Sequence, residues 1–336
     1  MMRGKNSLFD KAFRIGLNPY GIAYSVGLFA PPERRNPAPL GLRGFLDLAE
    51  SIDAAGVELP CALLKGVADA EVDAVCARLH RQERYAILMH GISWGDLDGA
   101  LNCARRFRFK TIRMHLTAIL SGARAAVRHW PELFAANSAA LVRFAAQAGE
   151  AGIGMTLEDH QDLGSGELLE LCERCGPHAG ICLDTGNPFS VGEDPLDFAR
   201  AVAGRTRHVH LKDYRIHWSA EGYRLARCAI GAGAVDFAGL AEILAPQGPL
   251  PASIEPGALS ERHIRLLCDD WWEGYPPGAR ASLLSCLRTA SARRAPDSAD
   301  WRTPWERGAS PEEIVAYEQQ ELRQSVAFLT QAPQAR

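Results

Sequence analysis

The sequence has no apolar run approaching the roughly 20 residues of a membrane-spanning helix. Its first residues, 1–7, are polar and contain no apolar core of a signal peptide. The net charge is only −3 over 336 residues, which is not the basic excess that marks many nucleic-acid-binding proteins. We therefore expect a cytoplasmic protein that binds neither membranes nor nucleic acids.

The chain also lacks the patterns of a zinc knuckle, a disulfide framework and a dinucleotide-binding loop. Its nine cysteines are odd in number and scattered. Cys172 and Cys175 form a CxxC pair within a helix-like stretch, and no second CxxC accompanies it. No glycine-rich phosphate loop follows the first predicted strand. The cysteines therefore indicate free thiols in a reducing compartment.

What the chain does have is a regular alternation of strand-like and helix-like segments. Each short apolar run is followed by a helical pattern or by a stretch long enough for one, which predicts parallel βα units. A barrel of about 250 residues plus an extension fits the length of 336. The sequence therefore predicts an α/β fold, a (β/α)8 TIM barrel over residues 10–257, with strands near 13–17, 57–60, 85–90, 111–115, 155–158, 180–184, 208–213 and 252–255.

Residues 258–336 continue beyond the last barrel unit. Ser310, Pro311 and Glu313 form a capping box with proline in the first turn, which predicts a helix from there to about residue 329. We expect a helical C-terminal extension packed on the barrel or on a partner. Within it, Trp271 and Trp272 suggest a platform for a large sugar substrate or a partner surface, and simple packing is an equal alternative.

Four of the predicted strands end on a side chain that can bind a metal: Glu158, Asp184, His210 and Glu255. Parallel strands gather such ends on one face of a barrel, where catalytic residues are usually found. Taken alone, each of these residues is better explained as an ordinary polar cap of a strand. Together, three carboxylates and one imidazole predict a site for one divalent metal ion, with Mn2+ favoured and Mg2+, Co2+ or Zn2+ as alternatives.

The motifs around these four residues are Glu158-Asp159-His160, 183–187 (Leu-Asp-Thr-Gly-Asn), 208–213 (His-Val-His-Leu-Lys-Asp) and 254–256 (Ile-Glu-Pro). In this order they resemble the xylose isomerase-like TIM barrel superfamily over roughly residues 13–257. That superfamily includes sugar phosphate isomerases and epimerases, inosose dehydratases and apurinic endonuclease family 2. The resemblance implies that the four strand-end residues bind the metal and that Glu158 and Glu255 also act as base and acid.

The resemblance implies a divalent-metal-dependent isomerase or epimerase that abstracts an α-proton from a sugar, keto-sugar or sugar phosphate. One alternative is a metal-dependent lyase. It would be similar to an inosose dehydratase, or to the large subunit of a 3-oxo-glycoside deglycosidase, which works with a small partner subunit. Another alternative is a non-catalytic sugar-binding barrel. A homo-oligomer is compatible with each of these.

Further polar residues near the predicted strand ends are candidates for contact with the carbohydrate. An interior structural role is an equal alternative for His160 and His208, and Glu58 is either a site residue or a structural cap. Lys212 and Asp213 are expected to pair with each other. The predicted substrate contacts are His90, His115, His160, Asn187, His208 and Arg215.

At some positions this chain carries a different residue from the one that particular members of the superfamily carry. Gly164 and Asn187 stand where the ketohexose 3-epimerases carry a glutamate and a histidine. The apurinic endonucleases need that same histidine and a further zinc-binding pair near residues 225–227, where this chain reads Leu-Ala-Arg. A trinuclear zinc site is therefore incomplete, and a single-metal enzyme is expected.

The protein should accordingly bind about one divalent ion per chain and should not cleave abasic DNA, because Asn187 and Arg227 replace required zinc ligands. Mass spectrometry of the native protein with metal analysis, together with a nicking assay on an abasic duplex, checks this expectation. A content near three zinc ions per chain, with cleavage of the duplex, would contradict it.

Overall fold

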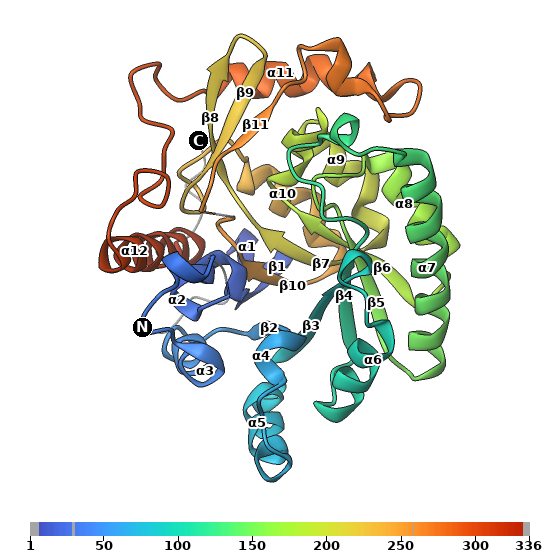
Figure 1. Ribbon diagram of the computed structural model, residues 1–336, viewed down its shortest axis with the longest axis vertical. Coiled ribbons are helices and arrows are strands. Elements are labelled where there is room, and N and C mark those ends of the chain that lie inside the picture. The colour runs from blue at the N-terminus through green and yellow to red at the C-terminus, as the bar shows by residue number, and fades with distance from the viewer. Residues whose placement is uncertain (1–6, 29–30, 258, 332–336) are drawn as a thin grey trace.

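The computed structural model describes residues 7–28, 31–257 and 259–331. Within them, parallel strands close into a barrel in the order β1-β10-β7-β6-β5-β4-β3-β2 (Figure 1). The predicted (β/α)8 barrel is confirmed. The first six residues, which were part of the signal-peptide argument, and residues 258 and 332–336 of the predicted extension lie outside the described residues.

The observed elements match the predicted alternation closely. The predicted seventh strand, however, was too long at its end, because β7 stops before Lys212. The barrel strands are β1 (Phe13–Leu17), β2 (Gly56–Pro60), β3 (Tyr85–Gly91), β4 (Thr111–His115), β5 (Gly154–Glu158), β6 (Ala179–Asp184), β7 (Thr206–Leu211) and β10 (Leu250–Ile254). The helices of the barrel region are α1 (Leu8–Ala12), α2 (Ala23–Val26), α3 (Gly41–Ser51), α4 (Cys61–Leu64), α5 (Val72–Leu79), α6 (Leu97–Arg106), α7 (Trp130–Glu150), α8 (Ser165–Arg174), α9 (Pro195–Val202) and α10 (Phe237–Leu244).

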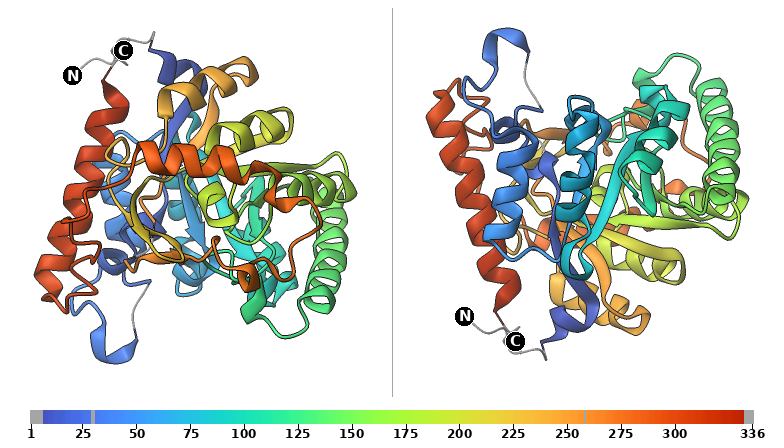
Figure 2. Two further views of the ribbon diagram at one scale, coloured as in Figure 1. Left: turned by 90° about the horizontal axis from the view of Figure 1, so that it is seen from above. Right: turned by 90° about the horizontal axis from the view of Figure 1, so that it is seen from below.

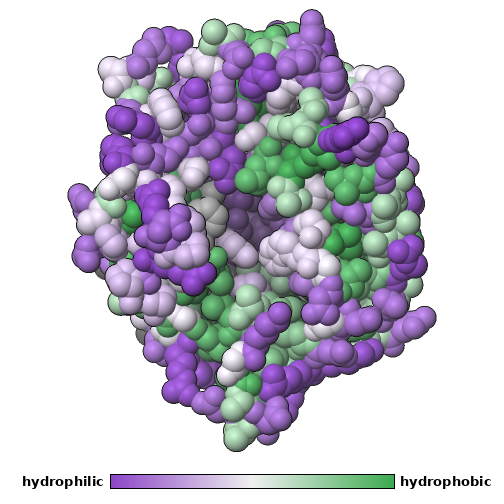
Figure 3. Space-filling view, viewed as in Figure 1, coloured by the Kyte–Doolittle hydropathy of each residue, from purple (hydrophilic) through white to green (hydrophobic). Residues whose placement is uncertain are grey.

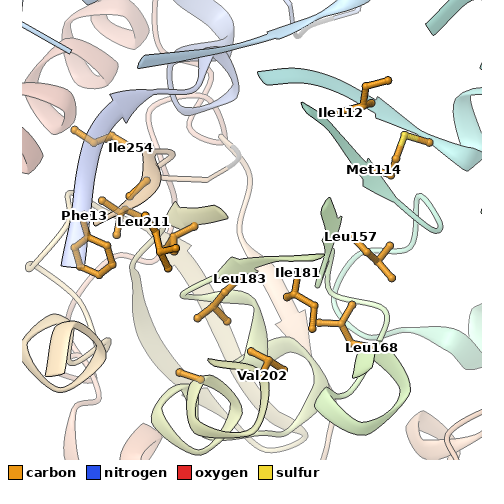
Figure 4. Packing of buried hydrophobic residues seen from close by; sticks show 14 of the residues in the cluster. Phe13, Ile112, Met114, Leu157, Leu168, Ile181, Leu183, Val202, Leu211 and Ile254 are labelled. Carbon is orange, nitrogen blue, oxygen red and sulfur yellow. The ribbon is translucent and has the colours of Figure 1, made fainter. Parts of the chain in front are cut away.

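The barrel strands present apolar side chains to the helices and polar ones to the barrel interior. Figure 4 shows Leu157 and Ile181 beside Leu168 of α8 in the layer between strands and helices. Burying each such side chain contributes about 1.5–3 kcal/mol. Because successive strand residues alternate in direction, the neighbours of these residues, such as Glu158 and Cys182, point inward. A polar interior on a fully buried parallel sheet is unusual, and it marks the place of a site.

A small antiparallel sheet, which the sequence did not predict, follows β7. It consists of β8 (Tyr214–Ser219), β9 (Gly222–Arg227) and β11 (Arg262–Ile264), with β9 in the middle. In Figure 1 this sheet stands above the barrel, next to α11 (Leu283–Ala292). The region after residue 257 therefore contributes a strand as well as helices.

The last helix, α12 (Pro311–Thr330), runs along one side of the molecule (Figure 2). Its predicted capping box is present, because the Ser310 side chain accepts a hydrogen bond from the backbone N–H of Glu313. The buried face of α12 is only partly apolar. Ile314 and Leu322 are buried, but the carboxylate of Glu318 is buried on the same side.

The contacts of Glu318 explain why a carboxylate can be buried on this face of α12. It accepts hydrogen bonds from the backbone N–H of Tyr24 (3.1 Å) and from both the N–H (2.8 Å) and the hydroxyl (2.6 Å) of Ser25. Arg227 of β9 lies 3.7 Å from Glu318 and 2.7 Å from Glu321. These bonds connect α12 to α2 and to the small sheet.

The tryptophan pair does not form an exposed platform. The side chains of Trp271 and Trp272 are buried, and their indole N–H groups donate to the carbonyl oxygens of Ser121 (3.2 Å) and Leu266 (2.9 Å). Tyr275 stacks on Trp271 at a centroid distance of 5.0 Å. These two tryptophans pack inside the protein, so the interpretation as a substrate platform or partner surface is wrong.

Within the part of the chain that the structure describes, no helix combines the length and the apolar character that crossing a bilayer requires.

Replacing Glu318 with alanine should lower the free energy of unfolding by roughly 3–5 kcal/mol, because it removes one partner from a buried, charged hydrogen-bond network. Gln320→Ala, at an exposed position of the same helix, is the matched control and should change stability by less than about 0.5 kcal/mol. Urea denaturation measures both. Equal stabilities of the two variants would show that the network does not hold α12 in place.

Candidate active site

The four predicted metal-binding side chains lie at the ends of neighbouring barrel strands. Glu158 ends β5, Asp184 ends β6, His210 is the last but one residue of β7, and Glu255 follows β10 directly. These strands are adjacent in the barrel, so their C-terminal ends meet at one mouth. Figure 3 shows a hollow lined by hydrophilic residues near the centre of the view, where the barrel strands lie in Figure 1.

Three carboxylate oxygens surround Nδ1 of His210. The distance from Nδ1 is 3.1 Å to Oε1 of Glu158, 3.2 Å to Oε2 of Glu255 and 3.8 Å to Oδ2 of Asp184. Glu255 is the most accessible of the four, with 10% of its side chain exposed. The structure thus brings the four side chains together, and their roles as ligands and catalysts remain predictions.

Glu58, on β2, fixes the orientation of the His210 ring. Its two oxygens lie 3.0 Å from Nε2 of His210 and 3.0 Å from Nε2 of His208. Burial alone would raise the pKa of Glu58, but the two histidines outweigh burial and hold that pKa well below its usual range. Because the ionised carboxylate can only accept, both Nε2 atoms carry the hydrogen. Nδ1 of a neutral His210 is then free to bind a metal, which makes Glu58 a residue of the site.

Two buried cations lie against the cluster. Nη1 of Arg113 lies 3.0 Å from Oε2 of Glu158. Nζ of Lys212 lies 2.5 Å from Oδ2 of Asp184 and 3.0 Å from Oε1 of Glu255. Glu158 and Glu255 contact a cation through the oxygen that does not face His210, whereas Oδ2 of Asp184 faces both Lys212 and His210.

The surrounding charges shift the titration of the cluster. Burial would raise the pKa of Glu158, but Arg113 and His210 hold it well below its usual range. Burial opposes charge on Lys212 as well, but Asp184 and Glu255 outweigh it and raise its pKa well above the ordinary value. At neutral pH, therefore, Glu158 is ionised and Lys212 is protonated.

The composition of the cluster fits a divalent cation. Its four carboxylates, on Glu58, Glu158, Asp184 and Glu255, outnumber the two cations of Arg113 and Lys212. Burial opposes charge on His210, but Cys182 and the carboxylates outweigh it and raise the His210 pKa well above its ordinary value; a divalent ion bound at Nδ1 would supply that positive charge instead. An oxygen-rich set with one imidazole suits Mn2+ or Mg2+ and also accepts Co2+ or Zn2+.

The partners of two buried carboxylate oxygens and the spacing of the ligand atoms support the same conclusion. Oε2 of Glu158 and Oδ2 of Asp184 are buried and accept no hydrogen bond of good geometry from any described residue, although a cation lies beside each. Each of these oxygens is therefore held by an ion pair alone, and a metal ion would supply a further partner for a buried carboxylate oxygen. Ligand atoms of Glu158, Asp184 and His210 all lie within 4.8 Å of one another, a spacing from which one ion can be shared.

Two predicted substrate contacts, His115 and His160, lie beside this cluster. Their rings stack at a centroid distance of 4.7 Å, and both have a ligand atom within 4.8 Å of Glu158. Nδ1 of His115 lies 3.1 Å from Nη1 of Arg113. A side chain at Gly91 would place Cβ about 2.0 Å from the His115 ring, so glycine at the end of β3 makes room for this histidine.

The other four predicted substrate contacts either point away from the cluster or bond to other groups of the protein. His90 points away from the cluster, because Gly91 next to it faces His115 and strand residues alternate. His208 is fully buried and held by Glu58. Asn187 is buried, and its amide donates to the carbonyl of residue 159 (2.9 Å). Arg215 is exposed on β8. The structure thus brings His115 and His160 to the cluster but not His90, Asn187 or Arg215, and contact of these side chains with a carbohydrate stays a prediction.

The predicted pairing of Lys212 with Asp213 is wrong. Asp213 turns away and accepts hydrogen bonds from the backbone N–H groups of Gly231 (3.0 Å), Gly233 (2.8 Å) and Val235 (3.0 Å). It therefore shapes the loop that follows β9, while Lys212 belongs to the site.

Sequence reasoning missed Arg113 and Trp94 and misassigned Lys212. Arg113 is a charged residue in the middle of a strand of buried residues, which is itself a signal, because such a charge needs a buried partner. Trp94 follows β3, is 44% exposed, and contacts the rings of His115 (4.7 Å) and His90 (5.6 Å) between centroids. No sequence pattern singled out Trp94.

A pocket of about 520 Å3 has Trp94 in its wall. Its wall is formed by α4, α6 and the residues between β3 and α6, and it includes Tyr20, Cys61, His90 and Cys103. Trp94 thus lines this pocket and also contacts the ring of His115.

Comparison with known proteins agrees with the geometry. The model of the xylose isomerase-like TIM barrel family matches residues 46–269. The chain belongs to this family, as the motifs around the four strand-end residues predicted.

Individual relatives are distant. The 3-oxo-isoapionate decarboxylase of Pectobacterium atrosepticum is 25% identical over 269 residues, which cover 76% of this chain and 85% of that protein. A D-psicose 3-epimerase structure determined in the presence of D-fructose superimposes with a TM-score of 0.59 at 13% identity, covering 95% of this chain and 100% of the other. An L-ribulose 3-epimerase structure gives 0.52 at 16% identity, covering 83% and 97%. The two structures show the shared fold.

Glu58→Gln should lower the affinity for Mn2+ by about 10–100-fold, because the amide cannot accept hydrogen bonds from both histidines and the His210 ring loses its fixed orientation. Glu242→Gln, an exposed change on α10, is the control and should leave the affinity unchanged. Calorimetric titration of the metal-stripped protein gives both values. Unchanged Mn2+ binding by Glu58→Gln would contradict the orienting role.

Proposed function

We propose that the protein is a divalent-metal-dependent enzyme that removes and returns a proton next to the carbonyl of a keto-sugar, as an isomerase or epimerase does. The observation that carries this proposal is the convergence of Glu158, Asp184 and Glu255 on Nδ1 of His210. A divalent ion bound there would polarise a carbonyl and acidify the hydrogen on the neighbouring carbon.

Glu255 is the better placed of the two glutamates to remove that proton. It is the most exposed member of the cluster, and its other contacts are Asn18, whose amide donates to Oε2 (2.6 Å), and Lys212. Arg113 keeps the pKa of Glu158 low, so Glu158 stays ionised and supplies charge more readily than a proton. Lys212, protonated and 3.0 Å from Glu255, can hold an anionic oxygen of the substrate.

The rings around the cluster would position the sugar. His115, His160 and Trp94 form an edge on the side of Glu158, with the indole partly exposed. Imidazole nitrogens can bind hydroxyl groups, and an indole face packs well against the C–H face of a sugar.

A second candidate, decarboxylation of a 3-oxo sugar acid, is favoured by the two fixed cations. Arg113 and Lys212 are both buried beside the cluster, where a substrate carboxylate would need a positive partner. In this reaction the bond to the carboxylate carbon breaks, CO2 leaves, and the electron pair passes to the ketone as an enolate that is then protonated. The similarity to the 3-oxo-isoapionate decarboxylase, over most of the chain, supports the same class of substrate.

One experiment separates these candidates. The Mn2+-loaded protein is incubated in D2O with ketopentoses, ketohexoses, keto-glycosides and 3-oxo sugar acids, and NMR records deuterium incorporation while CO2 release is measured. Deuterium at the α-carbon without CO2 supports the isomerase or epimerase, and CO2 from an acid substrate supports the decarboxylase. Saturable binding with neither result would overturn both and indicate a non-catalytic sugar-binding barrel.

Glu158→Gln and Glu255→Gln should each lower the rate of proton exchange by about 10²–10⁴-fold or more, because each loses a ligand charge and Glu255→Gln also loses the proposed general base. Circular dichroism should show an unchanged fold, and Glu170→Gln, exposed on α8, should exchange at the parent rate. If a metal-loaded Glu255→Gln variant exchanged as fast as the parent, Glu255 would not be the base.

A further inference from the structure

The barrel has a second pocket, of about 430 Å3, at the end opposite to the metal-binding cluster. Residues at the starts of six neighbouring strands, β3, β4, β5, β6, β7 and β10, line it. Parallel strands all start at the same end of a barrel, whereas Glu158, Asp184 and His210 stand where β5, β6 and β7 end. This amino-terminal pocket shares none of its wall residues with the cluster.

The wall of the amino-terminal pocket is positively charged. Arg84 directly precedes β3, Lys110 directly precedes β4, and Arg207 is the second residue of β7. His80 and His178 line the pocket as well. Among the described residues of this wall, none is an aspartate or a glutamate. Three cations that come from separate strands, without a balancing carboxylate, favour the binding of an anion.

These cations are poorly neutralised by the rest of the protein. Arg84 lies 3.9 Å from Glu50, which also pairs with Arg78 at 3.0 Å. Nη1 of Arg207 donates to two backbone carbonyl oxygens, at 2.9 and 3.2 Å. Lys110 and Arg207 are exposed, and neither forms an ion pair with any residue that the structure describes. Their charges therefore remain available to a bound anion.

The backbone is shaped to place Arg207 in this wall. The register between β6 and β7 shifts between Ile181 and Cys182, and Arg207 is the residue of β7 that is left without a partner in β6. Such a bulge redirects a side chain. A side chain at Gly180 would place Cβ 2.5 Å from Cγ of Arg207, so glycine at this position of β6 leaves room for the arginine stem.

A buried hydroxyl in the pocket lacks a partner. Thr156 of β5 lines the pocket, is 3% exposed, and its Oγ1 forms no hydrogen bond with any described residue. Thr156 lies two residues before Glu158 on the same strand, so its side chain also faces the barrel interior. A buried hydroxyl without a hydrogen bond is costly, and a ligand with an acceptor oxygen would remove that cost. This hydroxyl is evidence for a ligand that does not depend on the charges.

We propose that the amino-terminal pocket binds the phosphate group of a small phosphorylated metabolite. Arg84, Lys110 and Arg207 bind the phosphate oxygens, and Thr156 donates its hydroxyl hydrogen to an oxygen of the same ligand. A phosphate group suits this wall better than a single carboxylate does, because it carries about two charges and offers three acceptor oxygens, which guanidinium groups bind in pairs. The volume of about 430 Å3 is in the range of small-molecule sites and exceeds what a bare phosphate ion fills.

The first test is calorimetric titration of the metal-stripped, full-length protein at low ionic strength. Ribose 5-phosphate, fructose 6-phosphate and adenosine monophosphate are the probes, and inorganic phosphate and ribose are the controls. At least one probe should bind at one site per chain and more tightly than inorganic phosphate, and ribose should not bind. Added salt should weaken the binding, because exposed charges are screened. Saturable binding of inorganic phosphate alone, or of none of the probes, would overturn the proposal.

Variants of the two exposed cations locate the bound probe. Lys110→Gln and Arg207→Gln should each lower its affinity by about tenfold or more, because each removes a charged hydrogen-bond donor. Both side chains are exposed, so the fold should survive, which circular dichroism checks. Arg143→Gln removes the same charge from an exposed position of α7 outside the pocket, and it should bind the probe as the parent does. Parent affinity in both pocket variants, or an equal loss in Arg143→Gln, would contradict the assignment.

Thr156→Val tests the interior hydroxyl. Without ligand, the variant should be as stable as the parent or more stable, because a buried hydroxyl without a partner is removed. Its affinity for the bound probe should fall by about three- to tenfold, because one hydrogen bond to the ligand is lost. Parent affinity would show that the ligand does not reach Thr156 and would contradict the proposal. These titrations use neither metal nor turnover, so their outcome is independent of the proposed enzymatic reaction.

Discussion

The hydrogen bond between Glu58 and Nε2 of His210 is the constraint on which the site depends. A histidine that donates through Nε2 must direct Nδ1 elsewhere, and here Nδ1 meets oxygens of Glu158, Asp184 and Glu255. The same carboxylate also holds His208, so one residue of β2 orients two rings of β7 across the interior. Buried like this, the arrangement is costly unless its charges are balanced.

Charge balance links the cluster to the chemistry that we propose. Arg113 and Lys212 each neutralise a carboxylate from outside, and they leave a net negative cluster centred on His210. The negative centre attracts a divalent cation. The two cations at its edge attract an electron-rich group of the substrate. An isomerase and a decarboxylase of keto-sugars both need these two features, since both generate negative charge next to a carbonyl.

The sequence predicted the barrel and the four strand-end residues because each depends on a local pattern. An apolar run that ends on Glu158 or Asp184 predicts both a buried strand and a polar residue at its mouth. Contacts between distant segments have no such pattern. The pairing of Lys212 with Asp184 and Glu255, and the burial of Glu318 against α2, arise from tertiary packing, and adjacency in sequence wrongly suggested Asp213 as the partner of Lys212. The small β8–β9–β11 sheet was missed for a similar reason, because β11 is only three residues long and depends on its pairing with β9.

The most direct measurement of the central claim is anomalous diffraction from crystals soaked in Mn2+. The account predicts one strong peak per chain, about 2.0–2.6 Å from atoms of Glu158, Asp184, His210 and Glu255, with Nδ1 as the histidine ligand and Nε2 still bonded to Glu58. A peak at the His115–His160 pair alone, or the absence of any peak at the four residues under saturating Mn2+, would contradict it.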